Sequence, residues 1–210
     1  MIQILIVDDH EVVRHGLRDI LQRRLEQVSV VEAKDSREAM SHLAEKTWDL
    51  VLLDINLPGR SGLDVLNEVH RMSPRTRVLM LTAYPEEQFA VRAFKMGAAG
   101  YLNKQSASDE LVIAVKRILS GGKYVTASLA ERLADSLDSH SSAARHECLS
   151  SRELQVMRLV AGGRTIKQIA ADLALSEKTV ATYRTRIGEK MSLASNVEIA
   201  RYAVQNGLID

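Results

Sequence analysis

Two hydrophobic periodicities alternate along the first 122 residues, and this alternation constrains the fold more than any other feature of the chain. Short apolar runs rich in β-branched residues predict five strands, at 2–7, 28–33, 50–53, 78–81 and 100–102. Between these runs, apolar residues recur at the three- and four-residue intervals of helices. Residues 1–122 are therefore expected to form an α/β domain built on a doubly wound, five-stranded parallel sheet.

The pattern changes after Gly122, where residues 123–146 are interpreted as a linker. Leucines four residues apart, at positions 129, 133 and 137, predict a short helix within it. The polar stretch 139–142 predicts a hinge.

Residues 147–210 contain no strand-like run and carry four helix start signals. These signals are Ser150 with Glu153, Thr165 with Gln168, Ser195 with Glu198, and Ser176 alone. The expected helices span 151–161, 166–173, 177–191 and 196–206. Only three residues separate the second helix from the third, which is the short connection of a helix-turn-helix. A small all-α domain of four helices is expected here.

Composition and charge restrict the classes of function. The single cysteine, Cys148, excludes an internal disulfide and favours a reducing compartment. No apolar run approaches the roughly 20 residues of a membrane span, so a cytoplasmic protein without a membrane partner is expected. Residues 1–124 carry 17 basic and 17 acidic side chains, whereas residues 145–210 carry 10 and 7, a net charge of +3. This excess points mildly to polyanion binding by the second domain, although chance would also produce it.

Polar side chains follow the predicted strands at the edge where parallel sheets bind ligands. They are Asp8 and Asp9 after the first strand, Asp54 after the third, Thr82 after the fourth and Lys104 after the fifth. Three converging carboxylates repel one another, and Mg2+ accepts few carboxylates while keeping waters for a phosphate. A lysine and a hydroxyl opposite them would stabilise a transferring phosphoryl group. The pattern predicts a magnesium-dependent phosphoryl-transfer site.

These positions and their neighbours resemble the receiver domain of two-component response regulators, which has a flavodoxin-like fold. The matching segments are Asp8-Asp9, Asp54 followed by Ile-Asn-Leu-Pro-Gly, Thr82-Ala83, and Gly-Tyr-Leu-Asn-Lys at 100–104. The stretch DDHEVVRHGL at 8–17 is similar to the NarL/FixJ family in particular. A haloacid-dehalogenase-type phosphatase fits less well, because it needs an acid where this chain has His10. A flavin-binding flavodoxin also fits less well, because two aspartates would repel the phosphate.

The resemblance implies that Asp54 is the phosphoacceptor for a sensor histidine kinase. It further implies that Asp9 ligates Mg2+ directly, while Asp8 acts mainly through water. Asp54 itself and the backbone carbonyl of Asn56 would complete the protein ligands.

Three further residues gain roles from the same resemblance. Thr82 and Lys104 would bind the phosphoryl oxygens, and Tyr101 would be a switch residue that enters space vacated by Thr82. The phosphorylated receiver would then form a homodimer, through its fourth helix, fifth strand and fifth helix or through its first and fifth helices. Gln105 stands where many receivers carry proline, which affects the expected loop geometry only.

The four predicted helices resemble the LuxR-type four-helix DNA-binding motif, with helix 177–191 in the place of its recognition helix. The matching residues include Ser151-Arg152-Glu153, Gly162, Ile169-Ala170, Leu173, Ser176, Thr179-Val180, Ile187 and Lys190-Met191. The resemblance places Ala181, Thr182 and Thr185 where the family reads base edges of double-stranded promoter DNA. Without this resemblance, a generic helical bundle would be a serious alternative.

Four residues of the same helix are candidates for contacts with backbone phosphates: Lys178, Thr179, Arg184 and Lys190. Two residues depart from the family pattern. Tyr183 stands at a position often held by histidine, and Gly188 weakens the helix by ~1 kcal/mol relative to alanine.

The combined resemblance implies a phosphorylation-dependent, DNA-binding transcriptional regulator. It implies no enzyme activity beyond assistance with the receiver's own phosphorylation and dephosphorylation. The alternative is a phosphorylation-independent DNA-binding or interaction module with a non-signalling receiver. The complete set of polar residues at the strand ends argues against this alternative, because a degenerate receiver would normally have lost one of them.

Overall fold

The chain divides into two units, Met1–Ser139 and His140–Asp210. The computed structural model describes residues 1–84, 86–138 and 145–209. The hinge expected at 139–142 lies outside the described residues, and the helix expected in the linker is part of the first unit.

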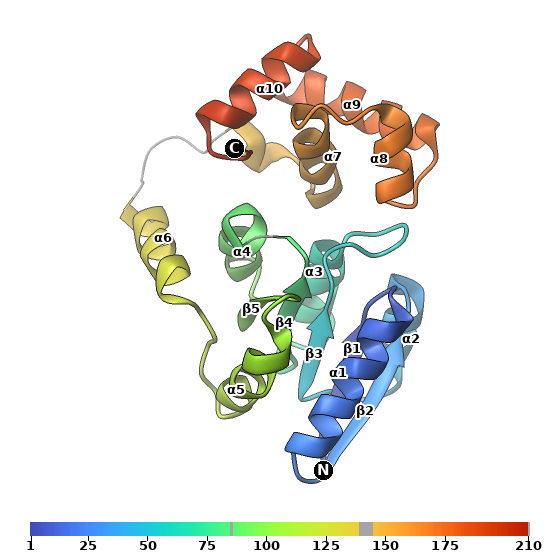
Figure 1. Ribbon diagram of the computed structural model, residues 1–210, viewed down its shortest axis with the longest axis vertical. Coiled ribbons are helices and arrows are strands. Elements are labelled where there is room, and N and C mark those ends of the chain that lie inside the picture. The colour runs from blue at the N-terminus through green and yellow to red at the C-terminus, as the bar shows by residue number, and fades with distance from the viewer. Residues whose placement is uncertain (85, 139–144, 210) are drawn as a thin grey trace. The chain divides into compact units, whose positions relative to one another are not determined.

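A five-stranded parallel sheet forms the centre of the first unit, in the order β2-β1-β3-β4-β5 (Figure 1). The strands are β1 (Ile2–Val7), β2 (Val28–Ala33), β3 (Leu50–Leu53), β4 (Arg77–Thr82) and β5 (Gly100–Asn103). The expected doubly wound parallel sheet is confirmed. Strand β4 extends one residue beyond the predicted run at each end, because Arg77 pairs with Leu50 and Thr82 with Asn103.

Helices cover both faces of this sheet (Figure 1). Side chains alternate between the two faces of a strand, so a strand that is apolar at every position, such as β3, must be covered on both. On one face, Ile4 and Ile6 pack with α1 (Glu11–Arg24) and α5 (Ala107–Leu119). The intervening Leu5 is also fully buried. The remaining helices of the sheet are α2 (Ser36–Glu45) and α3 (Gly62–Met72), which contact each other, and α4 (Glu86–Lys95), which contacts β5.

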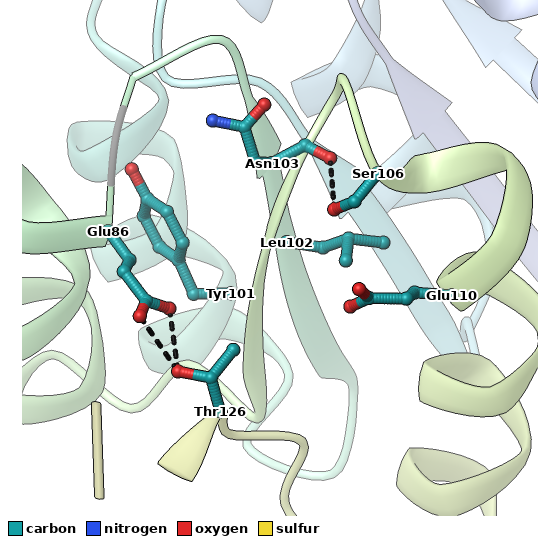
Figure 2. Close-up of a pocket in the computed structure, with 7 residues that line it drawn as sticks. All are labelled: Glu86, Tyr101, Leu102, Asn103, Ser106, Glu110 and Thr126. Atoms are coloured by element: carbon teal, nitrogen blue, oxygen red, sulfur yellow. Dashed lines mark hydrogen bonds between the residues drawn. The ribbon is translucent and has the colours of Figure 1, made fainter. Parts of the chain in front are cut away.

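The segment after α5 returns to the edge of the sheet and leads into α6 (Ala127–Asp138), which contacts α4 (Figure 1). Tyr124 pairs with Gly100 as an isolated parallel bridge, and its N–H donates to the carbonyl of Ala99 at 2.9 Å. The hydroxyl of Thr126 then donates to the carboxylate of Glu86, as Figure 2 shows. The chain therefore extends the sheet edge briefly before α6 begins.

The second unit contains the four expected helices, preceded by a 3-10 turn at Arg145–Cys148. They are α7 (Ser151–Ala161), α8 (Ile166–Asp172), α9 (Glu177–Met191) and α10 (Asn196–Gln205). Ser150 and Thr165 form complete capping boxes with Glu153 and Gln168, which explains where α7 and α8 begin. Contacts of α9 with α7 and α8, and of α10 with α7, hold the four helices together.

No helix among the described residues combines the length and the apolar character that crossing a bilayer requires.

Candidate functional site

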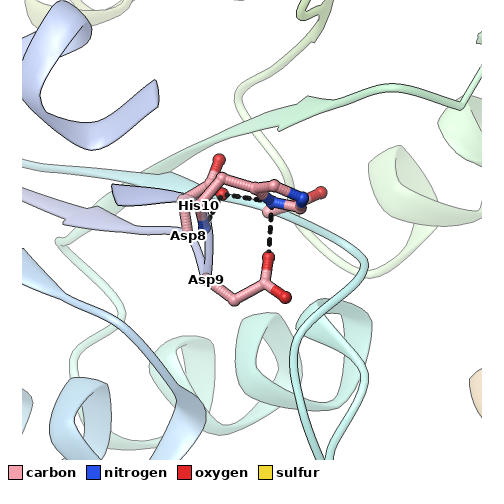
Figure 3. A group of neighbouring side chains, drawn as sticks. Asp8, Asp9 and His10 are labelled. Atoms are coloured by element: carbon pink, nitrogen blue, oxygen red, sulfur yellow. Dashed lines mark hydrogen bonds and ion pairs between the residues drawn. The ribbon is translucent and has the colours of Figure 1, made fainter. Parts of the chain in front are cut away.

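The carboxyl ends of β1 and β3 bring three aspartates together. One ligand atom from each of Asp8, Asp9, Asp54 and His10 lies within 4.8 Å of all the others. Asp8 and Asp54 are only 2% and 3% exposed, whereas Asp9 and His10 are exposed. Figure 3 shows Asp9 and the ring of His10 on the loop after β1, with His10 Nδ1 2.7 Å from Asp9 Oδ1. These hard oxygen donors fit the magnesium site expected from the sequence.

Lys104 follows β5 at the same edge of the sheet and joins the two buried carboxylates. Its Nζ lies 2.6 Å from Asp8 Oδ2 and 2.7 Å from Asp54 Oδ2. Burial raises the pKa of Asp54 above its usual range; the charge of Lys104 opposes this rise, and the charge of Asp8 adds to it. Burial alone would lower the pKa of Lys104, but the two carboxylates hold it above its ordinary value. A half-buried cation therefore already faces the predicted phosphoacceptor.

Backbone contacts fix the position of Asp54 at the end of β3. Its N–H donates to the carbonyl of Val7 at 2.9 Å, and its Oδ1 accepts from the N–H of Asn56 at 3.2 Å. Gly62, the first residue of α3, donates its N–H to the carbonyl of Ile55 at 2.8 Å. A Cβ at Gly62 would lie 1.9 Å from the carbonyl oxygen of Asp54. Gly62 is thus a positioning residue that the sequence analysis missed.

Arg14 is a second residue that the sequence analysis missed. One of its guanidinium nitrogens donates to the backbone carbonyl of Asp8 at 2.7 Å, and its Nε donates to Glu32 at 3.2 Å. It therefore fixes the loop that carries Asp8 and Asp9. The helical pattern of α1 gave no signal that separates Arg14 from the neighbouring Arg18, which also pairs with Glu32.

Thr82 is the last residue of β4, and Tyr101 lies within β5. Thr82 is fully buried, and its hydroxyl oxygen accepts from the N–H of Tyr84 at 3.4 Å. Tyr101 is also buried, and its hydroxyl donates to the carbonyl of Tyr84 at 3.0 Å. Both expected switch residues therefore bond to the same residue of the β4–α4 loop. Movement of Tyr101 on phosphorylation stays a prediction.

Helix α9 presents a buried side and an exposed side. Val180, Ile187 and Met191 are buried. Thr182 and Thr185 are exposed, and their hydroxyls donate to the carbonyls four residues earlier, at 2.9 and 3.1 Å. These hydroxyl oxygens keep lone pairs that face solvent.

The other predicted contact residues of α9 differ in their surroundings. Lys178 is exposed, Ala181 and Thr179 are half-buried, and Thr179 bonds to the Ser176 cap. Arg184 donates to Asn196 Oδ1 at 3.0 Å, which ties α9 to the start of α10.

Gly188 has a structural explanation within α9. A Cβ at this position would lie 2.9 Å from the carbonyl oxygen of Leu193, in the turn that follows the helix. The N–H of Leu193 donates to the carbonyl of Gly188 at 3.0 Å. Glycine therefore permits a close approach that an alanine would prevent, at the cost in helix propensity noted from the sequence.

Lys190 is paired within the second unit, because its Nζ lies 2.7 Å from Glu153 Oε2. Burial by itself would raise the pKa of Glu153, but the bonds from Lys190 and from the Ser150 backbone outweigh this effect and lower it. A contact between Lys190 and a DNA phosphate would have to share or replace this ion pair.

Replacing Lys190 with methionine is expected to destabilise the second unit by about 1–2 kcal/mol at neutral pH, since it leaves the Glu153 carboxylate without its cation. A carboxylate whose pKa is lowered by folding stabilises the protein above its unfolded value, here 4.5, and this contribution is lost as the pH falls through the lowered pKa. Calorimetry should therefore show the gap between wild type and variant closing in acid. Lys167→Met, which removes an exposed lysine of α8, is the control and should leave the unfolding transition in place. A gap independent of pH would contradict the assigned role of the pair.

Comparisons with known proteins agree with both halves of this arrangement. The family model "Response regulator receiver domain" matches residues 4–116, and the model "Bacterial regulatory proteins, luxR family" matches residues 147–203. The chain is 37% identical over 212 residues to response regulator GacA of Pseudomonas aeruginosa, covering all of this chain and 99% of GacA. It is 35% identical over 210 residues to response regulator UvrY of Escherichia coli (strain K12), covering 99% of this chain and 96% of UvrY.

Solved structures show the same fold. A LuxR-family two-component response regulator from Aurantimonas sp. SI85-9A1 is 36% identical with a TM-score of 0.59, over 65% of this chain and 97% of that one. The response regulator RcsB in complex with DNA has a TM-score of 0.60 at 24% identity, over 100% of this chain and 99% of that one. These findings agree on the family of the chain. The receiver model matches more than half of the chain, the relatives match over its full length, and the second unit matches the luxR family. The chain belongs to the NarL/FixJ family of two-component response regulators, with a receiver domain followed by a LuxR-type helix-turn-helix domain.

Proposed function

We propose that this protein is a cytoplasmic, phosphorylation-dependent regulator of transcription that accepts a phosphoryl group on Asp54 from a sensor histidine kinase, dimerises and binds promoter DNA. The observation that carries the proposal is the ion-paired bridge from Lys104 to Asp8 and Asp54 at the carboxyl ends of the strands. The domain boundaries that we propose are 1–122 for the receiver, 123–146 for the linker and 147–210 for the DNA-binding domain.

The proposed reaction is a transfer between two nucleophiles. A carboxylate oxygen of Asp54 forms a bond to phosphorus while the bond from phosphorus to the kinase's histidine nitrogen breaks, and that nitrogen keeps the electron pair. Lys104, already 2.7 Å from the carboxylate, is placed to stabilise negative charge on the phosphoryl oxygens, and Thr82 would donate to one of them. No separate general base is required, because Asp54 attacks as a carboxylate.

Asp9, Asp54 and the carbonyl of Asn56 would hold Mg2+ directly, and Asp8 would hold it mainly through water. When bound, the ion supplies positive charge that offsets the repulsion among the carboxylates and the incoming phosphoryl group. The cluster of carboxylate oxygens within 4.8 Å supports this assignment.

The exposed side of α9 supports the proposal of DNA reading. Because the hydroxyls of Thr182 and Thr185 donate to their own helix, their oxygens can accept hydrogen bonds from the amino groups of adenine or cytosine. Lys178 lies in the first turn of α9, where free backbone N–H groups also favour a phosphate. The small side chain of Ala181 would let the helix approach the bases closely.

To test DNA reading, we expect Lys178→Ala to lower affinity on every sequence and to reduce the slope of log affinity against log salt by about one, because one phosphate contact is lost. Thr182→Ala or Thr185→Ala should instead change base preference by ~1 kcal/mol at one position. Fluorescence anisotropy across a salt series, on selected and scrambled duplexes, separates the two effects.

The matched control is Lys34→Ala, which removes an exposed lysine between β2 and α2, outside both candidate dimer faces, and should leave the salt slope unchanged. If the threonine variants behave like Lys178→Ala, the recognition side of α9 is misassigned. If none of them matters, the second unit does not read DNA with this helix.

The dependence on phosphorylation is tested by measuring DNA affinity before and after treatment with acetyl phosphate and Mg2+. We expect tighter binding after treatment, because pairing of two receivers would place two recognition helices on one two-fold site. Equal affinity despite full labelling would favour the alternative of a phosphorylation-independent DNA-binding module.

A further inference from the structure

Helix α6 is attached to the switch side of the receiver by polar bonds and by a buried leucine. The Thr126 hydroxyl lies 2.8 and 2.9 Å from the two carboxylate oxygens of Glu86, the first residue of α4. One turn further along the chain, Leu129 is completely buried. We call the Thr126–Glu86 bond together with the packing of α6 on α4 the linker latch.

Two residues that precede the linker latch, Lys123 and Tyr124, are held by contacts that do not involve α6. The hydroxyl of Tyr124 bonds to the carboxylate of Glu110 on α5, and Arg117 Nε donates to the carbonyl of Lys123 at 2.6 Å. Burial and the neighbouring carboxylates raise the pKa of Tyr124 to about 12, so this phenol stays a donor at physiological pH. Residues 123 and 124 are therefore anchored to β5 and α5 whether or not α6 is attached.

Glu86 lies on the same short stretch of chain that contacts both switch residues. Thr82 accepts from the N–H of Tyr84, and Tyr101 donates to the carbonyl of Tyr84, two residues before Glu86. A shift of Thr82 toward a phosphoryl group would weaken its bond to Tyr84. A displacement of this loop would then act directly on the carboxylate that holds Thr126.

A pocket that is open to solvent lies beside the linker latch. It has a volume of about 240 Å³ and is lined by Tyr101, Glu86 and Thr126, and further by Leu102, Asn103, Ser106 and Glu110. Figure 2 shows Tyr101 and the Glu86–Thr126 bond on one side of this space and Glu110 on the other. Because this pocket is open to solvent, water can reach the Glu86–Thr126 bond and replace either partner, so the bond separates more readily than one inside a close-packed core.

We propose that the linker latch holds α6 on the face formed by α4, β5 and α5. Phosphorylation of Asp54 opens the linker latch by moving Glu86 away from Thr126, and α6 is then released. While α6 is docked, the α4 side of this face is covered by the chain itself and cannot pair with a second receiver. Because α6 precedes the segment that joins the DNA-binding unit, its release lengthens the undocked stretch of chain between the two units. The release step rests on the proposed phosphorylation of Asp54, whereas the docking does not.

The test measures amide hydrogen exchange in α6 of the full chain, in Mg2+, with and without beryllofluoride as a mimic of the phosphoryl group. In the wild type, exchange in α6 should become about tenfold faster with beryllofluoride, while the amides of Gly122 and Tyr124, which donate to Arg117 and Ala99, stay protected. Glu86→Ala should give fast α6 exchange without beryllofluoride. Ser128→Ala, which removes an exposed hydroxyl of the same helix, is the control and should behave like the wild type.

Thr126 also caps α6, because its hydroxyl accepts from the N–H of Leu129 at 3.1 Å. A double-mutant cycle with Glu86→Ala and Thr126→Val therefore separates the latch from the cap. If the latch exists, the double variant exchanges no faster than Thr126→Val alone. Multiplying effects, or wild-type exchange in Glu86→Ala, would overturn the docking.

Failure of the latch and failure of the proposed function give different results. If acetyl phosphate labels Asp54 but beryllofluoride leaves α6 exchange unchanged, the release is wrong and the proposed function stands. If Asp54 is not labelled, the proposed function fails and the release fails with it. In that case the double-mutant cycle alone decides whether α6 is docked through Glu86.

Discussion

Replacing Asp54 with asparagine is expected to abolish the incorporation of a base-labile phosphoryl group from acetyl phosphate and Mg2+, as measured by intact mass. The amide has nearly the same shape as the carboxylate but lacks the nucleophilic, negatively charged oxygen. The fold should survive, because the amide avoids the cost of burying a charge, the same cost that raises the pKa of Asp54. Lys104 would retain its ion pair with Asp8 at 2.6 Å.

The matched control is Asp19→Asn, which neutralises an aspartate on the exposed surface of α1 and should label like the wild type. Sedimentation velocity of the same samples tests dimerisation: labelled wild type should shift to higher mass, whereas Asp54→Asn should not. Full labelling of Asp54→Asn, together with its loss in another aspartate variant, would show that the phosphoacceptor is misassigned. Identical mass distributions of labelled and unlabelled wild type would overturn phosphorylation-dependent dimerisation.

Replacing Gly62 with alanine is expected to destabilise the receiver by about 3 kcal/mol or more and to slow its phosphorylation. The added Cβ would lie 1.9 Å from the carbonyl oxygen of Asp54 and 2.9 Å from the Cα of Ile55. Both neighbours are backbone atoms, so no side-chain rotation relieves the overlap. The start of α3 or the loop carrying Asp54 must move, and either movement shifts the phosphoacceptor away from Lys104.

Urea unfolding followed by the fluorescence of Trp48 measures this effect, because the chain's single tryptophan is buried in the receiver. The matched control is Gly16→Ala within α1. Apart from its two chain neighbours and the nearby backbone of α1, no atom of the described residues lies within 4 Å of a Cβ added at Gly16. The variant should therefore gain up to ~1 kcal/mol from helix propensity. Equal stability of Gly62→Ala and wild type would contradict the close approach of α3 to Asp54.

The sequence by itself determined the secondary structure and the edge of the sheet that carries the site. Caps, apolar runs and helical spacings act between residues close in the chain, which is why Ser150 and Thr165 start their helices where expected. The convergence of Asp8, Asp54 and Lys104 also followed, because residues after parallel strands share one edge. The family resemblance then supplied roles that spacing alone does not give.

The tertiary structure decided which groups touch. Lys190 meets Glu153 across 37 positions, and Thr126 meets Glu86 across 40. Such pairs depend on how helices pack on the sheet and on one another, and no local spacing encodes these distances.

Gly62 and α6 illustrate the same difference. A glycine after a serine cap reads in sequence as a tolerable helix start, and only the packed backbone of Asp54 excludes a Cβ there. The leucine spacing within 127–138 predicted a helix but not the surface that it covers. An amphipathic pattern shows that one side of a helix must be buried, but it does not identify the element that buries it. Local periodicity therefore determined the elements of this protein, and long-range packing determined the contacts on which its proposed switch depends.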